Sequence, residues 1–138
     1  MEIKWVDTHC HLQLLNKNLN ESHYKNIEFL IIPGVDVESS SKAKEISSSL
    51  EVESYWSAGL HPHDAKLLDT QRYELEKLFV EADLIGETGL DFYRNLSTKE
   101  EQRENFLFHL EFSKQLNKPI IIHCRDSFQD TYDLLVEF

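Results

Sequence analysis

His9 and His11 lie two residues apart, directly after an apolar and β-branched segment at the start of the chain. On an extended backbone, residues two apart point to the same face, so both imidazoles can bind one cation while Cys10 points away. Glu87 and His123 each follow another short apolar run. A carboxylate can bridge two divalent ions, and His123 can then bind the second ion. These four residues therefore predict a centre for two divalent metal ions.

Two metal ions held about 3.5 to 4 Å apart lower the pKa of a shared water and stabilise both the attacking and the leaving oxygen. The pattern therefore indicates metal-assisted hydrolysis rather than redox or group-carrier chemistry. A lone His-x-His pair also occurs by chance on many strands, so the prediction of a metal site depends equally on Glu87 and His123. Cys10 and Cys124 are expected to be buried thiols facing the helices, because each alternates out of phase with its neighbouring histidine.

The elements that must position these residues follow from the hydrophobic pattern, in which strand-like runs alternate with helical periods. Strands are expected at residues 4–8, 27–32, 52–58, 83–86 and 119–123. A loop is expected at residues 87–96. Helices are expected to begin at Asp36 or one of residues 39–41, at Thr70, at Ser97 and at about Phe128.

The helix that begins at Ser97 has the strongest local signals. Ser97 and Glu100 match a capping box, in which each side chain satisfies a backbone donor of the other. Its buried stripe is predicted to comprise Phe106, Leu110 and Ser113. His109, on the same helix, is interpreted as a surface or packing residue.

Strand and helix alternating five times predict a parallel sheet with right-handed crossovers. In such sheets the functional residues lie at the carboxyl ends of the strands. The candidate residues that end or follow a predicted strand are His9, His11, His61, Glu87 and His123. A flavodoxin-like open sheet and a βα barrel both fit this order, and the long loop after the first strand favours the barrel.

Composition narrows the class of protein. The chain has 138 residues, 41% of them hydrophobic, and a formal charge of -11, which argues against a broad basic surface for nucleic acid. No apolar run reaches the roughly 18 residues of a membrane span, so no membrane partner is expected. Two cysteines are too few for a disulfide scaffold, which favours a reducing cytoplasm.

Five segments resemble the TatD family of metal-dependent deoxyribonucleases, within the amidohydrolase-like superfamily. They are residues 7–12 (DTHCHL), residues 59–63 (GLHPH), residues 85–94 (IGETGLDFYR), Gln102 with Phe106, and residues 119–126 (PIIIHCRD). The GETGLD stretch is the most specific of them. The segments occur in order over nearly the whole chain, which makes coincidence a poor explanation.

The resemblance implies hydrolysis of phosphodiester bonds in DNA by a 3′ to 5′ exonuclease that acts on single-stranded or frayed ends. Two divalent ions are implied, magnesium first, with manganese and zinc as alternatives. By position, His9 and His11 resemble ligands of the first metal, and His123 resembles a ligand of the second. Glu87 resembles the bridging, catalytic carboxylate. His61 and Arg125 resemble groups that hold a substrate phosphate.

The sequence gives weaker support for a functional role of three further residues. Asp91 and Arg94 match the family pattern, but the shape of their loop alone could account for the match. His63 is interpreted as a residue that caps the turn after Pro62.

The family fold is an eight-stranded βα barrel, which usually needs about 250 residues. The chain is therefore expected to form a single, incomplete domain over residues 1–138, an α/β fold with about five of the eight βα units of a TIM-type barrel. A second-metal histidine and a first-metal aspartate would then lie on strands beyond these five.

Two other functions remain open. The chain could be an inactive fragment, or one completed by a second chain or a carboxy-terminal segment. It could also be a metal hydrolase of a small ester, amide or lactone in the same superfamily.

Overall fold

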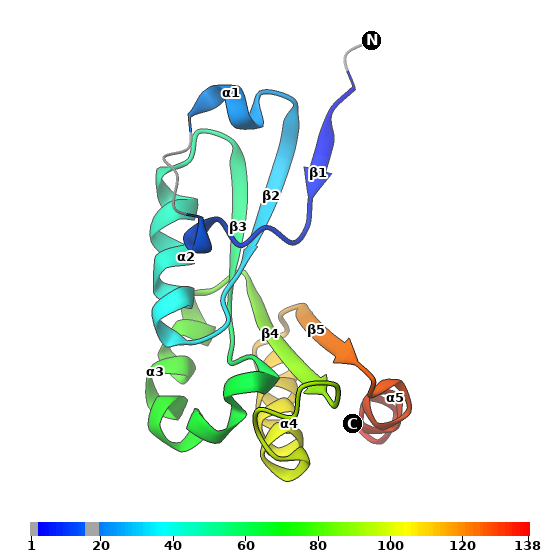
Figure 1. Cartoon of the computed structure of the whole chain (residues 1–138). Coiled ribbons are helices and arrows are strands. Elements are labelled where there is room, and N and C mark those ends of the chain that lie inside the picture. Colours follow the sequence, from blue (N-terminus) through cyan, green and yellow to red (C-terminus); the bar gives the residue numbers. More distant parts are fainter. Residues whose placement is uncertain (1–2, 16–19) are drawn as a thin grey trace.

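The computed structural model describes residues 3–15 and 20–138, and within these ranges five parallel strands form one sheet in the order β1-β2-β3-β4-β5 (Figure 1). The strands are β1 (Trp5–Asp7), β2 (Ile27–Pro33), β3 (Glu53–Ala58), β4 (Leu84–Asp91) and β5 (Ile120–Arg125). Each crossover moves to the next neighbour in the same direction, as in a βα barrel, whereas a flavodoxin-like sheet reverses its order. The sheet is thus a half-barrel, which confirms the predicted fold class.

The described helices are η1 (Leu12–Leu14), α1 (Glu21–Tyr24), α2 (Val37–Ser49), η2 (Pro62–Leu67), α3 (Leu68–Glu81), α4 (Lys99–Leu116) and α5 (Phe128–Glu137). Helix α2 begins after Asp36, whose carboxylate accepts the Ser39 N–H, as one of the predicted caps requires. Helices α2 and α3 lie side by side along one side of the sheet (Figure 1). In the described part of the chain, no helix has the length and apolar character needed to cross a bilayer.

Strand β4 is longer than the sequence predicts. It runs on to Asp91 where a loop was expected from residue 87, because residues 88–91 pair with β5. The pairing brings Gly89 so close to β5 that an added Cβ would lie 2.1 Å from the His123 carbonyl oxygen. Gly89 also has a positive φ of 137°, which side chains disfavour. Glycines therefore lengthen this strand where strand propensity alone indicates a loop.

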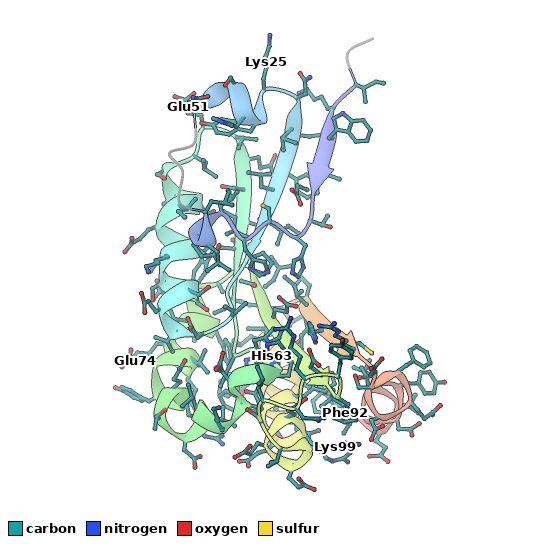
Figure 2. The ribbon with its side chains drawn as sticks, in the orientation of Figure 1. Lys25, Glu51, His63, Glu74, Phe92 and Lys99 are labelled. Atoms are coloured by element: carbon teal, nitrogen blue, oxygen red, sulfur yellow. The ribbon has the colours of Figure 1, made fainter. Side chains whose placement is uncertain are left out.

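Two apolar clusters form the core. The larger lies between the sheet and helices α2, α3 and α4, and Phe79 is fully buried in it. The smaller joins Leu90 to Phe106 and Leu110, so two of the three residues of the predicted stripe are buried, and Ser113 is half-buried. Charged side chains such as Glu74 project from the outside of the molecule (Figure 2).

Helix α4 begins one residue later than predicted. The capping box consists of Thr98 and Glu101 rather than Ser97 and Glu100. Ser97 is instead buried, where its hydroxyl donates to the His63 carbonyl oxygen and accepts the N–H of Lys66. This residue joins the start of α4 to helix η2.

Helix α4 also carries a buried polar stripe of Gln102, Asn105 and His109, each fully buried. Asn105 donates to the Leu60 carbonyl oxygen at 2.7 Å, and His109 Nε2 accepts the Leu60 N–H at 3.0 Å. His109 Nδ1 donates to the Asn105 carbonyl oxygen. His109 is therefore a packing residue, and the stripe holds the backbone directly before His61.

His109 should make stability depend on pH. Burial lowers its pKa from 6.5 to about 4, whereas the imidazole of the unfolded chain keeps an ordinary pKa. The unfolded state binds the extra proton, so stability falls as the pH drops from about 6.5 to about 4, by about 3 kcal/mol at most. Urea unfolding of His109→Gln should show a shallower loss over this range.

At pH 7, His109→Gln should itself be destabilised by about 1 to 3 kcal/mol, because a flexible amide replaces a rigid ring that bonds both the buried Leu60 N–H and the Asn105 carbonyl oxygen. His23→Gln, at an exposed position, is the control and should match the wild type. Equal pH slopes for His109→Gln and the wild type would contradict the assignment.

Candidate metal centre

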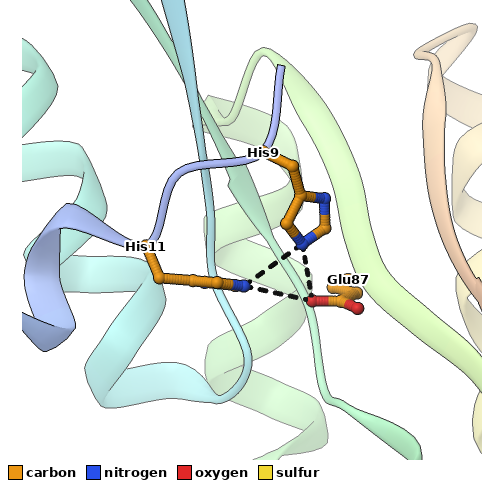
Figure 3. Close-up of side chains that lie close together, drawn as sticks. All are labelled: His9, His11 and Glu87. Carbon is orange, nitrogen blue, oxygen red and sulfur yellow. Dashed lines mark hydrogen bonds and ion pairs between the residues drawn. The ribbon is translucent and has the colours of Figure 1, made fainter. Parts of the chain in front are cut away.

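The first group of ligand atoms consists of His9, His11 and Glu87, which the sequence predicts to meet (Figure 3). The Nε2 atoms of His9 and His11 lie 3.2 Å apart, and both lie within 3.4 Å of Glu87 Oε2. Nδ1 of His11 is 3.0 Å from the Pro33 carbonyl oxygen, to which it can only donate. With Nδ1 committed to this bond, Nε2 faces Glu87, carrying a hydrogen when the ring is protonated and a lone pair when the ring is neutral.

The backbone conformation that brings His9 and His11 to Glu87 differs from the predicted one. Strand β1 ends at Asp7, and the two histidines lie in the segment after it rather than on an extended strand. The His9 N–H donates to the Asp7 carboxylate, and the Cys10 N–H donates to the Ile31 carbonyl oxygen of β2. These bonds turn the segment toward the sheet.

The two cysteines differ. Cys10 is half-buried, packs against the larger cluster and donates its thiol to the Ile31 carbonyl oxygen, so it faces away from the imidazoles as expected. Cys124 is exposed, which corrects the prediction of a buried thiol. Alternation along β5 turns Cys124 away from His123, but that face of the strand edge is left uncovered.

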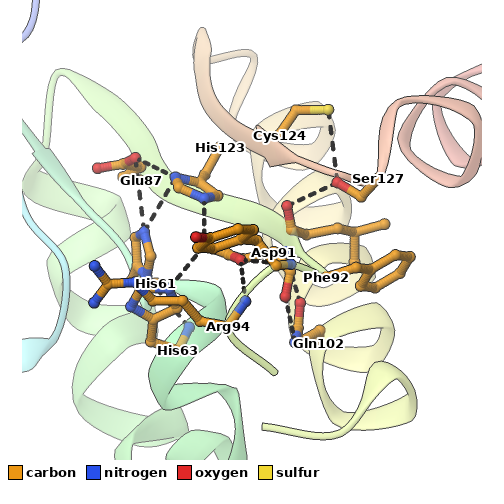
Figure 4. A network of polar contacts seen from close by, with 12 residues as sticks. His61, His63, Glu87, Asp91, Phe92, Arg94, Gln102, His123, Cys124 and Ser127 are labelled. Carbon is orange, nitrogen blue, oxygen red and sulfur yellow. Dashed lines mark hydrogen bonds and ion pairs between the residues drawn. The ribbon is translucent and has the colours of Figure 1, made fainter. Parts of the chain in front are cut away.

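The second group consists of His61, Glu87 and His123 (Figure 4). His123 Nδ1 lies 3.1 Å from Glu87 Oε1 and 3.2 Å from His61 Nε2. The two oxygens of Glu87 thus face different groups, Oε2 toward His9 and His11 and Oε1 toward His123. This is the geometry that a bridging carboxylate needs.

An irregularity in β4 sets the direction of the Glu87 side chain. The β4 register shifts between Ile85 and Thr88, so Glu87 stands outside the regular pairing with β5. Such bulges redirect side chains. The Glu87 N–H donates instead to the Gly34 carbonyl oxygen at the end of β2. Glu87 therefore lies within β4 rather than at its end, which corrects the predicted position.

The electrostatics of Glu87 favour a carboxylate. Burial raises its pKa, but hydrogen bonds from His11 and His123 outweigh burial and leave the pKa well below its usual range. The same hydrogen bonds raise the pKa of His11 and of His123. The buried negative charge and the surrounding imidazoles therefore stabilise each other, and a cation could replace the protons between them.

His61 presents a different atom to the site. Its Nδ1 accepts the His63 N–H at 3.2 Å, so a neutral His61 carries its proton on Nε2. Burial lowers the pKa of His61 to about 4, which keeps the ring neutral at pH 7. Nε2 therefore offers a hydrogen rather than a lone pair to the second group.

Asp91 and His63 contribute more to the site than the sequence indicates. Asp91 is fully buried, and its Oδ2 lies 2.8 Å from His63 Nε2 and 3.0 Å from His123 Nε2. Burial raises the pKa of Asp91, but the Arg94 N–H and the two imidazoles lower it to a net value of about 2. The two-residue spacing of His61 and His63 was a signal for His63, because it repeats the spacing of His9 and His11.

A cavity of about 330 Å³ joins both groups, and its lining comprises His9, His11, Val35, His61, His63, Asp64, Glu87 and His123. Arg125 and Arg94 are exposed and lie outside this lining. The Arg125 guanidinium lies 3.9 Å over the Tyr93 ring. The structure thus brings together five of the six predicted site residues, and Arg125 lies apart from them.

Imidazole nitrogens and a shared carboxylate are a donor set that suits divalent metal ions, so the residues fit the predicted metal centre. The family model described as TatD-related DNase matches residues 6–138. An uncharacterized metal-dependent hydrolase of Buchnera aphidicola is 35% identical over 96% of this chain and 54% of its own. The 3'-5' ssDNA/RNA exonuclease TatD of Escherichia coli is 37% identical over 77% of this chain and 42% of its own.

Solved structures agree on the fold. The TatD homologue YJJV of Escherichia coli superposes with a TM-score of 0.86 at 21% identity, over 99% of this chain and 57% of that one. A TatD family hydrolase of Entamoeba histolytica superposes with a TM-score of 0.84 at 22% identity, over 99% and 55%. The chain therefore spans about half the length of the relatives it matches.

Substitution of Glu87 should weaken both groups of ligands, because each uses one of its oxygens. Zinc titration of Glu87→Gln by calorimetry should show every binding step weakened at least about tenfold. His11→Ala should weaken only the step that belongs to the first group.

Glu104→Gln, at an exposed position on α4, is the matched control and should leave the isotherm unchanged. Circular dichroism of the metal-free variants checks that they fold. An unaltered zinc isotherm for Glu87→Gln would refute a shared carboxylate.

Proposed function

Because the chain belongs to the TatD-related DNase family, we propose that it provides the metal-binding part of a divalent-metal-dependent phosphodiester hydrolase. The observation that carries this proposal is the orientation of Glu87, whose two oxygens face two separate sets of imidazoles. A carboxylate shared in this way can hold two divalent ions at the separation that stabilises both the attacking and the leaving oxygen of a hydrolysis.

His9, His11 and Glu87 would hold one ion, and Glu87 and His123 the other. When bound, such ions lower the pKa of a water and neutralise charge on a phosphate. Glu87 would fix their separation, and its burial would keep the carboxylate from being hydrated between turnovers. Both roles belong to residues that the sequence already singles out.

His61 would hold the substrate phosphate. His61 lines the same cavity as the two ligand groups, and its Nε2, now 3.2 Å from His123 Nδ1, would be free to donate to a phosphate oxygen when a metal ion occupies that nitrogen. Arg125 would bind a second, more distant phosphate, because its guanidinium lies on the exposed end of β5 beside Tyr93. Together they would align a chain of phosphates across the site.

The substrate proposed is DNA, hydrolysed from the 3′ end of a single-stranded or frayed terminus. One relative is named a 3'-5' ssDNA/RNA exonuclease, which supports this polarity and adds RNA as a substrate to test. A net charge of -11 disfavours binding along a duplex, so metal ions and a few local cations would have to attract the phosphates.

The donor set bears on the choice of metal. Imidazole nitrogen is a typical ligand of zinc, whereas magnesium prefers oxygen ligands in an octahedral arrangement. A centre with three imidazoles and one carboxylate therefore supports zinc over magnesium, which the family resemblance puts first. Two free thiols are consistent with a reducing compartment, and we place the protein in the cytoplasm.

A second candidate is a chain that another polypeptide completes. Among the described residues, β1 and β5 each pair on one side only. Helix α5 leaves Phe128, Tyr132 and Val136 exposed by 74%, 54% and 66%. A second chain or a further βα segment could bury these side chains and add ligands, and the 138 residues alone would then be inactive.

The nuclease proposal predicts that the chain shortens 5′-labelled single-stranded DNA from its 3′ end when manganese, zinc or magnesium is added. Glu87→Gln should lower the rate at least about a hundredfold, since several kcal/mol of transition-state stabilisation depend on the metals. Glu104→Gln should retain the wild-type rate. Gel ladders report both rate and polarity.

The same assay separates the candidates. Turnover well above that of Glu87→Gln excludes the partner-completed chain, and a rate equal to that of Glu87→Gln contradicts an active nuclease in this chain. Intact DNA together with hydrolysis of a small phosphodiester or lactone would instead assign the site to a small ester.

A further inference from the structure

Asp91 is a buried charged group outside the candidate metal ligands. It is fully buried at the end of β4, and Figure 4 shows it between His123, His63 and the start of α4. Neither group of candidate ligands includes it. Its position behind the imidazoles, rather than among them, points to a role in orienting them.

Each oxygen of Asp91 has its own partners. Oδ1 accepts the backbone N–H groups of Tyr93 and Arg94 at 3.1 and 3.0 Å. Oδ2 faces Nε2 of His63 at 2.8 Å and Nε2 of His123 at 3.0 Å. A carboxylate only accepts hydrogen bonds, so both imidazole nitrogens at Oδ2 must carry hydrogen.

The consequence for His123 is specific. With hydrogen on Nε2, the lone pair of the neutral ring is on Nδ1, which lies 3.1 Å from Glu87 Oε1. We propose that Asp91 is a positioning residue that fixes His123 in its Nε2–H form, so that Nδ1 is the atom bound to the metal. This inference rests on the proposed metal centre. Carboxylates behind metal-bound histidines set the tautomer and orientation of the ring in this way.

Asp91 is itself held by α4. Gln102 accepts the Asp91 N–H at 2.7 Å and donates to the Asp91 carbonyl oxygen at 3.1 Å. The same amide donates to the Ser97 carbonyl oxygen at 2.9 Å. Because Gln102 is fully buried, these bonds fix the main chain of Asp91 from the side opposite to His123. The carboxylate itself is held by the Tyr93 and Arg94 N–H groups, which Oδ1 would lose if the side chain rotated away.

The two sides of the centre therefore differ. His11 donates from Nδ1 to the Pro33 carbonyl oxygen and presents Nε2, whereas His123 donates from Nε2 to Asp91 and presents Nδ1. A carbonyl and a carboxylate stand behind the two rings. The assignment predicts opposite ring nitrogens as ligands in one protein, and this is directly measurable.

The experiment is long-range proton–nitrogen NMR on the 138-residue chain labelled with ¹⁵N-histidine, with and without zinc. Zinc should shift the Nδ1 signal of His123 and the Nε2 signal of His11, while His123 Nε2 keeps its hydrogen. A zinc shift at His123 Nε2 would overturn the proposal, and this measurement needs no variant.

Variants test the cause. Asp91→Ala should remove the fixed Nε2–H form of His123 and weaken the zinc step of the second group about tenfold to a hundredfold. Asp91→Asn should recover much of that affinity, because its amide oxygen can still accept one hydrogen bond. Asp69→Ala, at an exposed position on α3, is the control. Unchanged His123 signals in a folded Asp91→Ala variant would refute the role of Asp91.

Failure of the metal centre looks different. If zinc shifts none of His9, His11 and His123, the proposed metal centre is wrong, and the inference about Asp91 falls with it. If zinc shifts His11 as expected but binds His123 through Nε2, only the inference about Asp91 is wrong. Because nucleic acid is absent, the result does not depend on nuclease activity.

Discussion

The buried carboxylate of Glu87 is the constraint on which the arrangement of the site depends. A carboxylate at 7% exposure must be compensated, and here imidazoles from three separate strands or their following segments surround it. Burial opposes ionisation, and the hydrogen bonds from His11 and His123 exceed that effect. The charge of one residue thus holds together the ends of β1 and β5, which are the two edges of the sheet.

Close strand approach makes this convergence possible. Gly86 has a φ of 113°, and an added Cβ would lie 2.4 Å from the Ile121 carbonyl oxygen of β5. Without a side chain at Gly86, the backbone of β4 can lie against β5 while the next residue turns into the cavity. The two glycines of the GETGLD stretch, Gly86 and Gly89, therefore allow Glu87 and His123 to lie close together and do not form a loop.

The convergence of His9, His11, Glu87 and His123 was predictable from the sequence, because apolar runs mark strands and parallel strands place their carboxyl ends together. The length of β4 could not be predicted from the sequence. Its pairing depends on β5, about 35 residues away, and on glycines, which strand propensity disfavours.

The role of Asp91 could not be predicted from the sequence for a related reason. Its partners His63, Gln102 and His123 come from three different elements, and hydrophobic periodicity reports only which face of a helix is apolar. A polar residue within a helix is normally assigned to solvent. Gln102, Asn105 and His109 break that rule together, because their spacing of three and four places them on one buried face of the helix.

Helix α4 therefore contributes to the site without supplying a ligand. Burying three polar side chains is unfavourable unless each finds partners. The partners found are the backbone of Leu60, directly before His61, and the backbone of Asp91, behind His123. An apolar helix face would pack as well against the sheet, but it could not hold either backbone at a fixed position. The polar stripe is thus explained by the precision that two imidazoles need, one as a hydrogen-bond donor and one as a ligand.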